Sequence, residues 1–131
     1  WANAQRVGEY LAQHAQVEEV FYAGLPTSKW HERAKRYGRG KGYGSVLAFN
    51  IKGGVEAGQK FVAGLKLHSH VANIGDVRSL VIHPASTTHS QLTPAEQAST
   101  GVFPGLVRLS VGLETIEDIL ADLDEGFKAA K

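Results

Sequence analysis

Hydrophobic and polar residues follow two different periods along the chain, one typical of helices and the other of strands. Where apolar residues recur every three or four positions, they predict helices with one buried face. Where they recur every second position, they predict half-buried strands. The predicted helices cover about 1–14, 27–37, 55–65, 93–101 and 116–127, and the predicted strands cover 17–22, 45–51, 67–74, 78–83 and 107–113.

Several residues at the ends of these segments are typical helix starts and stops. Thr27 and Ser28 follow the turn at 24–26, and we expect them to cap the second helix. The sequence 93–96, Thr-Pro-Ala-Glu, is a capping box with proline at the first helical position. Gly101 is placed to end that short helix, and Thr115 to cap the last one.

The order of these elements predicts one α/β domain, an α+β sandwich that spans residues 1–131. No linker, repeat or low-complexity segment divides the chain, and a hydrophobic fraction of 43% with 21% charged residues suits a single core. The strands at 67–74 and 78–83 have no helix between them. We therefore expect a mainly antiparallel sheet with helices chiefly on one face.

Composition narrows the possible functions. The 14 basic and 13 acidic residues leave a formal charge of +1, so no overall field would attract nucleic acid or an anionic membrane. No apolar run reaches the ~20 residues that span a bilayer. The absence of cysteine excludes disulfides and thiolate sites, and we expect a cytoplasmic protein. Because the first helix has no cap and the chain begins at Trp1 without any methionine, we expect residues to be missing upstream.

Two polar residues on predicted strands are candidates for ligand binding. In 106–113 the odd positions are apolar, so Arg108 lies on the other face, where its guanidinium could hold a carboxylate with two parallel hydrogen bonds. The pattern equally allows a surface ion pair. In 78–83, Ser79 lies on the face opposite Leu80 and Ile82, either as a ligand contact or as an ordinary hydroxyl at a strand end.

Two other patterns suggest alternative functions. His68 and His70 lie on one face of a strand, with His83 and His89 further on, but their spacing is not that of a tight metal site, and we expect no metal. The segment 33–44 contains five basic residues and two tyrosines, as in some single-strand nucleic-acid sites. Since no helix follows its glycines, they lack the geometry of a phosphate-binding loop, and we expect no nucleic-acid partner.

Two longer motifs resemble one known family. Residues 78–94, RSLVIHPASTTHSQLTP, and 101–114, GVFPGLVRLSVGLE, closely resemble the carboxy-terminal domain of the cysteine and methionine metabolism family of pyridoxal-phosphate enzymes. The opening helix, 22–26, 44–49 and the last helix are similar to this family as well, so the resemblance covers essentially the whole chain.

The resemblance implies a fold and two site residues. It implies the small domain of a fold type I enzyme, which packs against a large domain that binds pyridoxal phosphate. Arg108 matches the arginine that binds the α-carboxylate of the substrate, and Ser79 matches a serine that lines the same end of the site, near the lysine that bears the cofactor. Strand alternation is expected to turn both side chains away from the core.

The resemblance also implies a reaction for the parent enzyme. The greatest similarity is to members that exchange the acetate of O-acetyl-L-homoserine for sulfide or a thiol, with cystathionine γ-synthase, methionine γ-lyase or a non-catalytic fragment as alternatives. Members are usually homotetramers. None of the eight lysines has the Ser-x-Thr-Lys setting of the family's cofactor lysine. We therefore expect that the chain alone does not bind pyridoxal phosphate and is inactive.

Overall fold

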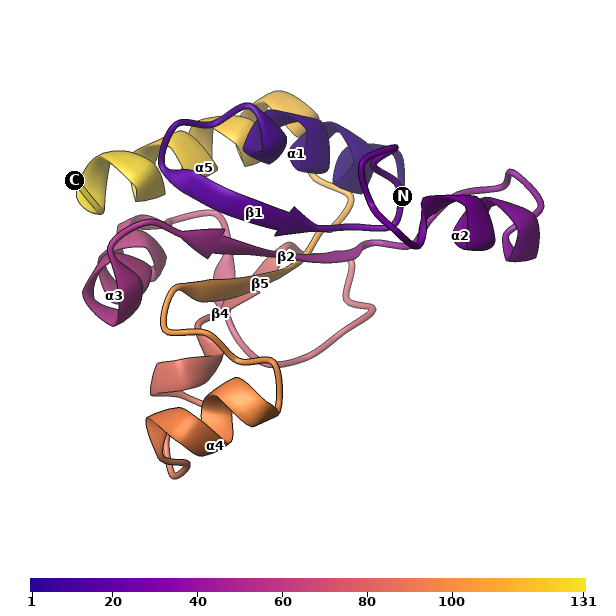
Figure 1. The fold of residues 1–131 in the computed structure, drawn as a ribbon. Helices are drawn as coiled ribbons and strands as arrows, with labels where there is room; N and C mark the ends of the chain where they lie inside the picture. Colours follow the sequence, from indigo (N-terminus) through magenta and orange to yellow (C-terminus); the bar gives the residue numbers. More distant parts are fainter.

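The computed structural model describes all 131 residues and contains a five-stranded sheet with helices (Figure 1). Its strands lie in the order β1-β2-β5-β4-β3, so β5 is the central strand. The elements are α1 (Ala2–Ala12), β1 (Val17–Phe21), α2 (His31–Tyr37), β2 (Val46–Ile51), α3 (Gly54–Gly64), β3 (Ser69–His70), β4 (Leu80–Ile82), the 3-10 turn η1 (Pro84–Ser86), α4 (Pro94–Ser99), β5 (Leu106–Ser110) and α5 (Ile116–Ala129).

The sheet is mainly antiparallel, as predicted. The pairs β1/β2, β2/β5 and β5/β4 are antiparallel, whereas β3 runs parallel to β4. Our reason for expecting antiparallel strands was therefore wrong, because it rested on the one pair that is parallel. The segment 71–79 returns the chain to the same end of the sheet without a helix, which is possible because β3 has only two residues.

Helices α1, α3 and α5 cover one face of the sheet, and the core lies between these helices and the sheet (Figure 1). The alternating residues of β2 and β5 point toward these helices and are almost fully buried, as their period predicts. Gly126 allows α3 and α5 to pack closely, because a Cβ there would lie 2.7 Å from a methyl carbon of Leu65. The sheet side of this core consists of Leu47, Phe49, Ile51, Val81, Val107, Leu109 and Val111.

Helix α2 lies outside this layered arrangement. It projects beyond the end of the sheet and has no buried residue (Figure 1). The helix begins after Trp30, and no side chain caps it, so the prediction that Thr27 and Ser28 cap it was wrong. The hydroxyl of Ser28 instead accepts the N–H of Trp30 at 3.2 Å, within the turn that precedes the helix.

Two other predicted helix starts had different outcomes. The capping box of Thr93 and Glu96 is formed at α4, with both reciprocal hydrogen bonds present. Gly101 follows that helix in the left-handed conformation, at φ +81°, which favours glycine. Thr115 is the N-cap residue of α5, but its side chain makes no capping hydrogen bond. No helix in the structure combines the length and the apolar character needed to cross a membrane.

Candidate functional site

Arg108 lies at the middle of the central strand. Its neighbours across the ladder are Ala48 on β2 and Ile82 on β4, so hydrogen-bonded strands on both sides hold its backbone. The side chain is half-buried on the sheet face opposite α1, α3 and α5. Its Nη2 donates to the carbonyl of Ala72 at 2.6 Å, and no carboxylate lies within ion-pair distance. The strand therefore presents a rigidly mounted cation that no internal acid neutralises.

Arg78, the other arginine of the two motifs, differs from Arg108 because it forms an ion pair within the chain. Its Nε and Nη2 donate to the carboxylate of Asp76 at 3.3 and 3.0 Å. These hydrogen bonds lower the pKa of Asp76 to about 2, so the pair stays ionised at neutral pH. Of these two arginines, only Arg108 can therefore offer its charge to an external carboxylate without first breaking an ion pair.

Ser79 is fully buried, contrary to the expectation that alternation turns it away from the core. It precedes β4 and shares its face with Val81, which packs in the core below the helices. Its hydroxyl donates to Oε1 of Glu114 at 2.9 Å and accepts the N–H of Gly112 at 2.9 Å. Arg108 on β5 and Ser79 just before the neighbouring strand β4 therefore have side chains on opposite faces of the sheet.

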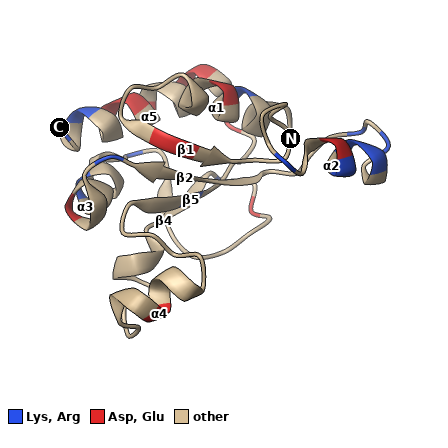
Figure 2. Ribbon diagram, in the orientation of Figure 1, with Lys and Arg blue, Asp and Glu red and all other residues tan.

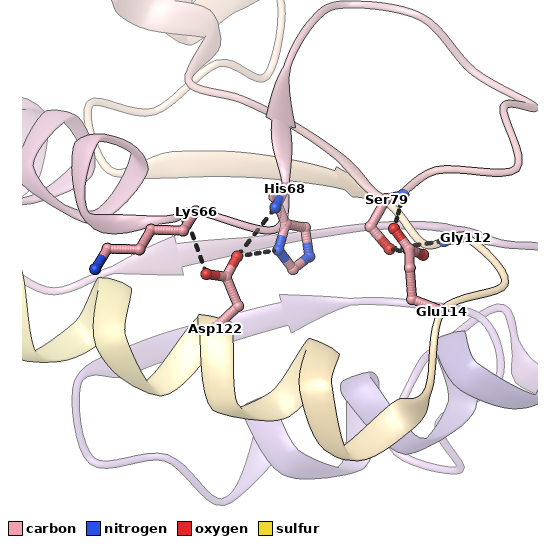
Figure 3. Close-up of polar contacts among 6 residues, drawn as sticks. All are labelled: Lys66, His68, Ser79, Gly112, Glu114 and Asp122. Carbon is pink, nitrogen blue, oxygen red and sulfur yellow. Dashed lines mark hydrogen bonds and ion pairs between the residues drawn. The ribbon is translucent and has the colours of Figure 1, made fainter.

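Glu114 is the partner that holds Ser79, as Figure 3 shows. Its carboxylate accepts the N–H of Ser79 at 2.7 Å as well as the hydroxyl. Burial acts to raise the pKa of Glu114, but the hydrogen bonds from Ser79 outweigh it and hold this pKa below its ordinary value. Asn3 of α1 donates to the carbonyls of Gly112 and Glu114, which fixes the same segment from the helix side.

A second buried polar cluster joins α5 to the segment before β3. Asp122 accepts the N–H groups of Lys66 and His68 at 2.7 and 3.0 Å, and its Oδ2 lies 2.7 Å from Nδ1 of His68 (Figure 3). Burial acts to raise the pKa of Asp122, but these bonds outweigh it and lower this pKa. Since a carboxylate only accepts, Nδ1 carries the proton. Nε2 of His68 is buried without a hydrogen-bond partner.

The hydrogen-bonded carboxylates of Glu114 and Asp122 predict a loss of stability in acid. The pKa values of Glu114 and Asp122 are lowered in the folded chain, so the unfolded chain takes up protons first as the pH falls. Their stabilisation is complete above the unfolded-state values, about 4.3 for Glu and 3.9 for Asp, and is lost as the pH falls through the lower folded-state values. Melting temperatures measured between pH 7 and pH 3 should fall less steeply in a Glu114→Gln, Asp122→Asn double variant. Equal slopes would show that these carboxylates do not contribute.

The remaining histidines make separate contacts. Nε2 of His83 donates to the carbonyl of Pro104 at 2.7 Å, which leaves Nδ1 to accept the hydroxyl of Ser86. Nδ1 of His89 pairs with the hydroxyl of Thr88, and His70 is exposed on β3. No group of three or more histidine, aspartate or glutamate side chains is placed to hold a metal ion.

The basic residues of the segment 33–44 gather on α2 and the loop after it, beyond the end of the sheet (Figure 2). Lys29 and Arg33 lie over the ring of Trp30, with cation-to-ring distances of 5.0 and 5.3 Å. The ring of Tyr43 stacks on His31. These aromatic rings are therefore already in contact with the protein's own side chains.

Comparison with known proteins assigns the chain to a family. The family model of the Cys/Met metabolism pyridoxal-phosphate-dependent enzymes matches residues 1–128. The chain belongs to this family. The family's cofactor is pyridoxal phosphate, and its matched segment contains both Arg108 and Ser79.

Relatives within the Cys/Met metabolism family include more than one activity. The O-acetyl-L-homoserine sulfhydrylase of Leptospira meyeri is 56% identical over 126 residues, which are 96% of this chain and 28% of that protein. The L-methionine gamma-lyase of Fusobacterium nucleatum subsp. polymorphum is 47% identical over 126 residues, 96% of this chain and 31% of that protein. The chain thus spans less than a third of the length of each relative.

A solved structure of the family has the same fold. It is a putative O-acetylhomoserine (thiol)-lyase from Campylobacter jejuni, with a TM-score of 0.89 and 36% identity over 97% of this chain and 30% of that one. Its lysine carries a pyridoxyl phosphate group. The predicted fold, a mixed α/β arrangement with a mainly antiparallel sheet, is therefore also present in this enzyme structure.

This chain offers one candidate for binding a carboxylate, but its residues do not fit the cofactor itself. Arg108 is free to bind an acid. The half-buried carboxylate of Glu114 and the buried carboxylate of Asp122 already accept hydrogen bonds from Ser79 and His68, so neither is free to pair with a pyridinium nitrogen. No step of the cofactor chemistry can therefore be assigned to side chains of this chain.

Proposed function

We propose that this chain is the single carboxy-terminal, substrate-gripping domain of a pyridoxal-phosphate-dependent O-acetyl-L-homoserine sulfhydrylase. The observation that supports this proposal is Arg108, a half-buried cation on the central strand with no acidic partner. A guanidinium in such a setting matches the α-carboxylate of an amino acid in both charge and shape. In the parent enzyme, Arg108 would hold that carboxylate and so orient the substrate toward the cofactor.

Ser79 lies on the face of the sheet opposite Arg108 and would support the proposed site from there. Its hydroxyl is engaged by Glu114 and Gly112, so we propose that it contributes by fixing the start of β4 rather than by offering a free hydroxyl. The cofactor, when bound, withdraws electrons from the substrate so that its γ-substituent can be exchanged. The protein's part is to position the substrate, which lowers the entropic cost of the reaction.

Sequence identity to these two relatives favours the sulfhydrylase over the methionine gamma-lyase. The sulfhydrylase relative shares 56% of aligned residues with this chain, against 47% for the methionine gamma-lyase. The parent would exchange the acetate of O-acetyl-L-homoserine for sulfide or a thiol. Cystathionine γ-synthase and methionine γ-lyase are the alternative activities, because they need the same grip on the α-carboxylate. We also propose, from the family resemblance, a cytoplasmic homotetramer in which a large domain supplies the cofactor.

The test is an assay of the full-length enzyme with O-acetyl-L-homoserine and sulfide. We expect homocysteine formation with a kcat/KM at least about tenfold above that for cystathionine formation from cysteine or for methionine cleavage. The 131-residue chain, mixed with pyridoxal phosphate, should show neither turnover nor a borohydride-reducible bond to lysine. A preference for methionine cleavage would overturn the sulfhydrylase assignment, and turnover by the isolated chain would overturn the assignment of a domain that depends on a partner.

A further inference from the structure

The segment 71–79, which connects β3 to β4, is held in place mainly by polar contacts with the β5 region. Arg108 donates to the carbonyl of Ala72 at 2.6 Å, and the N–H of Leu113 donates to the carbonyl of Val77 at 2.8 Å. The apolar side chains of this segment contribute little packing within the chain, because Val77 is 65% exposed and Ile74 is 63% exposed. The position of the segment relative to Arg108 therefore depends on its hydrogen bonds.

Glu114 makes two of these connections. Its two oxygens take the N–H and the hydroxyl of Ser79, the last residue of the segment, at 2.7 and 2.9 Å. The same hydroxyl accepts the N–H of Gly112, so two hydrogen bonds of the side chain and one of the backbone N–H meet at this buried residue. The backbones approach so closely here that a Cβ on Gly112 would collide with the carbonyl of Val77. The end of the segment is thus fixed against β5.

Fixing this segment also fixes the guanidinium of Arg108. The carbonyl of Ala72 holds one N–H of the guanidinium, and its position follows from that of the segment. The other N–H groups then point in a defined direction, which suits a carboxylate that accepts two parallel hydrogen bonds. If the segment shifts, the charge of Arg108 remains but its orientation is lost.

We propose that Glu114 is a positioning residue for substrate binding, acting through Ser79 and the segment 71–79 on the orientation of Arg108. This inference rests on the proposed function, in which Arg108 binds the α-carboxylate. Glu114 would not contact the substrate, since its oxygens are occupied by Ser79 and its negative charge would repel a carboxylate.

The experiment compares variants of the full-length enzyme with bound cofactor, using O-acetyl-L-homoserine and sulfide. Glu114→Gln keeps the shape of the side chain but replaces one acceptor with a donor that opposes Ser79. We expect KM for O-acetyl-L-homoserine to rise at least about fivefold while kcat changes less than about twofold. Glu114→Asp, which retains both acceptor oxygens, should restore part of the loss. Glu117→Gln removes the same charge at an exposed position three residues away and is the matched control.

A double-mutant cycle tests whether Glu114 acts through Ser79. The KM of Ser79→Ala, Glu114→Gln should equal that of the worse single variant, because both changes break the same connection. Additive effects on KM, or a Glu114→Gln enzyme that behaves like Glu117→Gln, would overturn this inference. Ser79→Ala alone decides the question if Glu114→Gln does not fold, and an unchanged KM would then count against it. An unchanged kcat/KM in the Arg108→Lys enzyme would instead overturn the proposed function, in which Arg108 binds the substrate.

Discussion

Replacing Arg108 with lysine in the full-length enzyme is expected to lower kcat/KM for O-acetyl-L-homoserine at least about tenfold, or roughly 1.4 kcal/mol of transition-state stabilisation. Lysine keeps the positive charge but cannot form two parallel hydrogen bonds with a carboxylate. It also cannot hold the carbonyl of Ala72 and bind the substrate in the same planar geometry. Steady-state kinetics with sulfide in excess would measure this loss.

A control is available in the neighbouring motif. Arg78→Lys makes the same chemical change in an arginine that already pairs with Asp76 and is exposed. We expect its kcat/KM to stay within about twofold of the wild-type value, because exposed ion pairs contribute little. Equal losses in the two variants would show that the effect comes from general disturbance of the domain, and an unchanged value in Arg108→Lys would remove this residue from the site.

The largest effect on stability is expected from Asp122→Ala. This change leaves the buried N–H and Nδ1 of His68 without an acceptor, and it also frees the N–H of Lys66. At about 1 to 3 kcal/mol for each buried group left unsatisfied, the free energy of unfolding should fall by about 3 kcal/mol. Urea unfolding of the chain would measure it.

The comparison with a neighbouring aspartate separates this effect from a change in net charge. Asp118 lies one turn earlier on α5 and is exposed. Asp118→Ala should cost no more than about 1 kcal/mol, which is the value of a favourable helix-end charge. A similar cost for both substitutions would mean that the hydrogen bonds of Asp122 contribute little to folding.

The period of the apolar residues predicted the helices of the core, the strands β1, β2 and β5 and the outward face of Arg108, but the strand predicted at 67–74 is limited to Ser69–His70. This prediction worked for Arg108 because β5 is paired on both sides, and its apolar residues Val107 and Leu109 leave no doubt about which face is buried. In a strand whose apolar residues all lie on one face, the sequence alone identifies the buried face, and the side-chain directions follow from alternation.

The same rule was wrong for Ser79 because β4 is buried on both faces. Leu80, Val81 and Ile82 are all buried, so the alternation separates two faces but does not say which one meets the helices. The hydrogen-bonding roles of Glu114 and Asp122 were not predicted, for another reason. Their hydrogen-bond partners lie 35 to 56 positions away along the chain, and no local pattern reports contacts of that separation.

The most direct test is a crystal structure of the full-length enzyme with an unreactive analogue of O-acetyl-L-homoserine. Both oxygens of the analogue's α-carboxylate should lie about 2.7 to 2.9 Å from guanidinium nitrogens of Arg108. Ser79 should still donate to Glu114 on the opposite side of the sheet. An α-carboxylate bound by another residue, with Arg108 facing solvent, would contradict the proposed role of this domain.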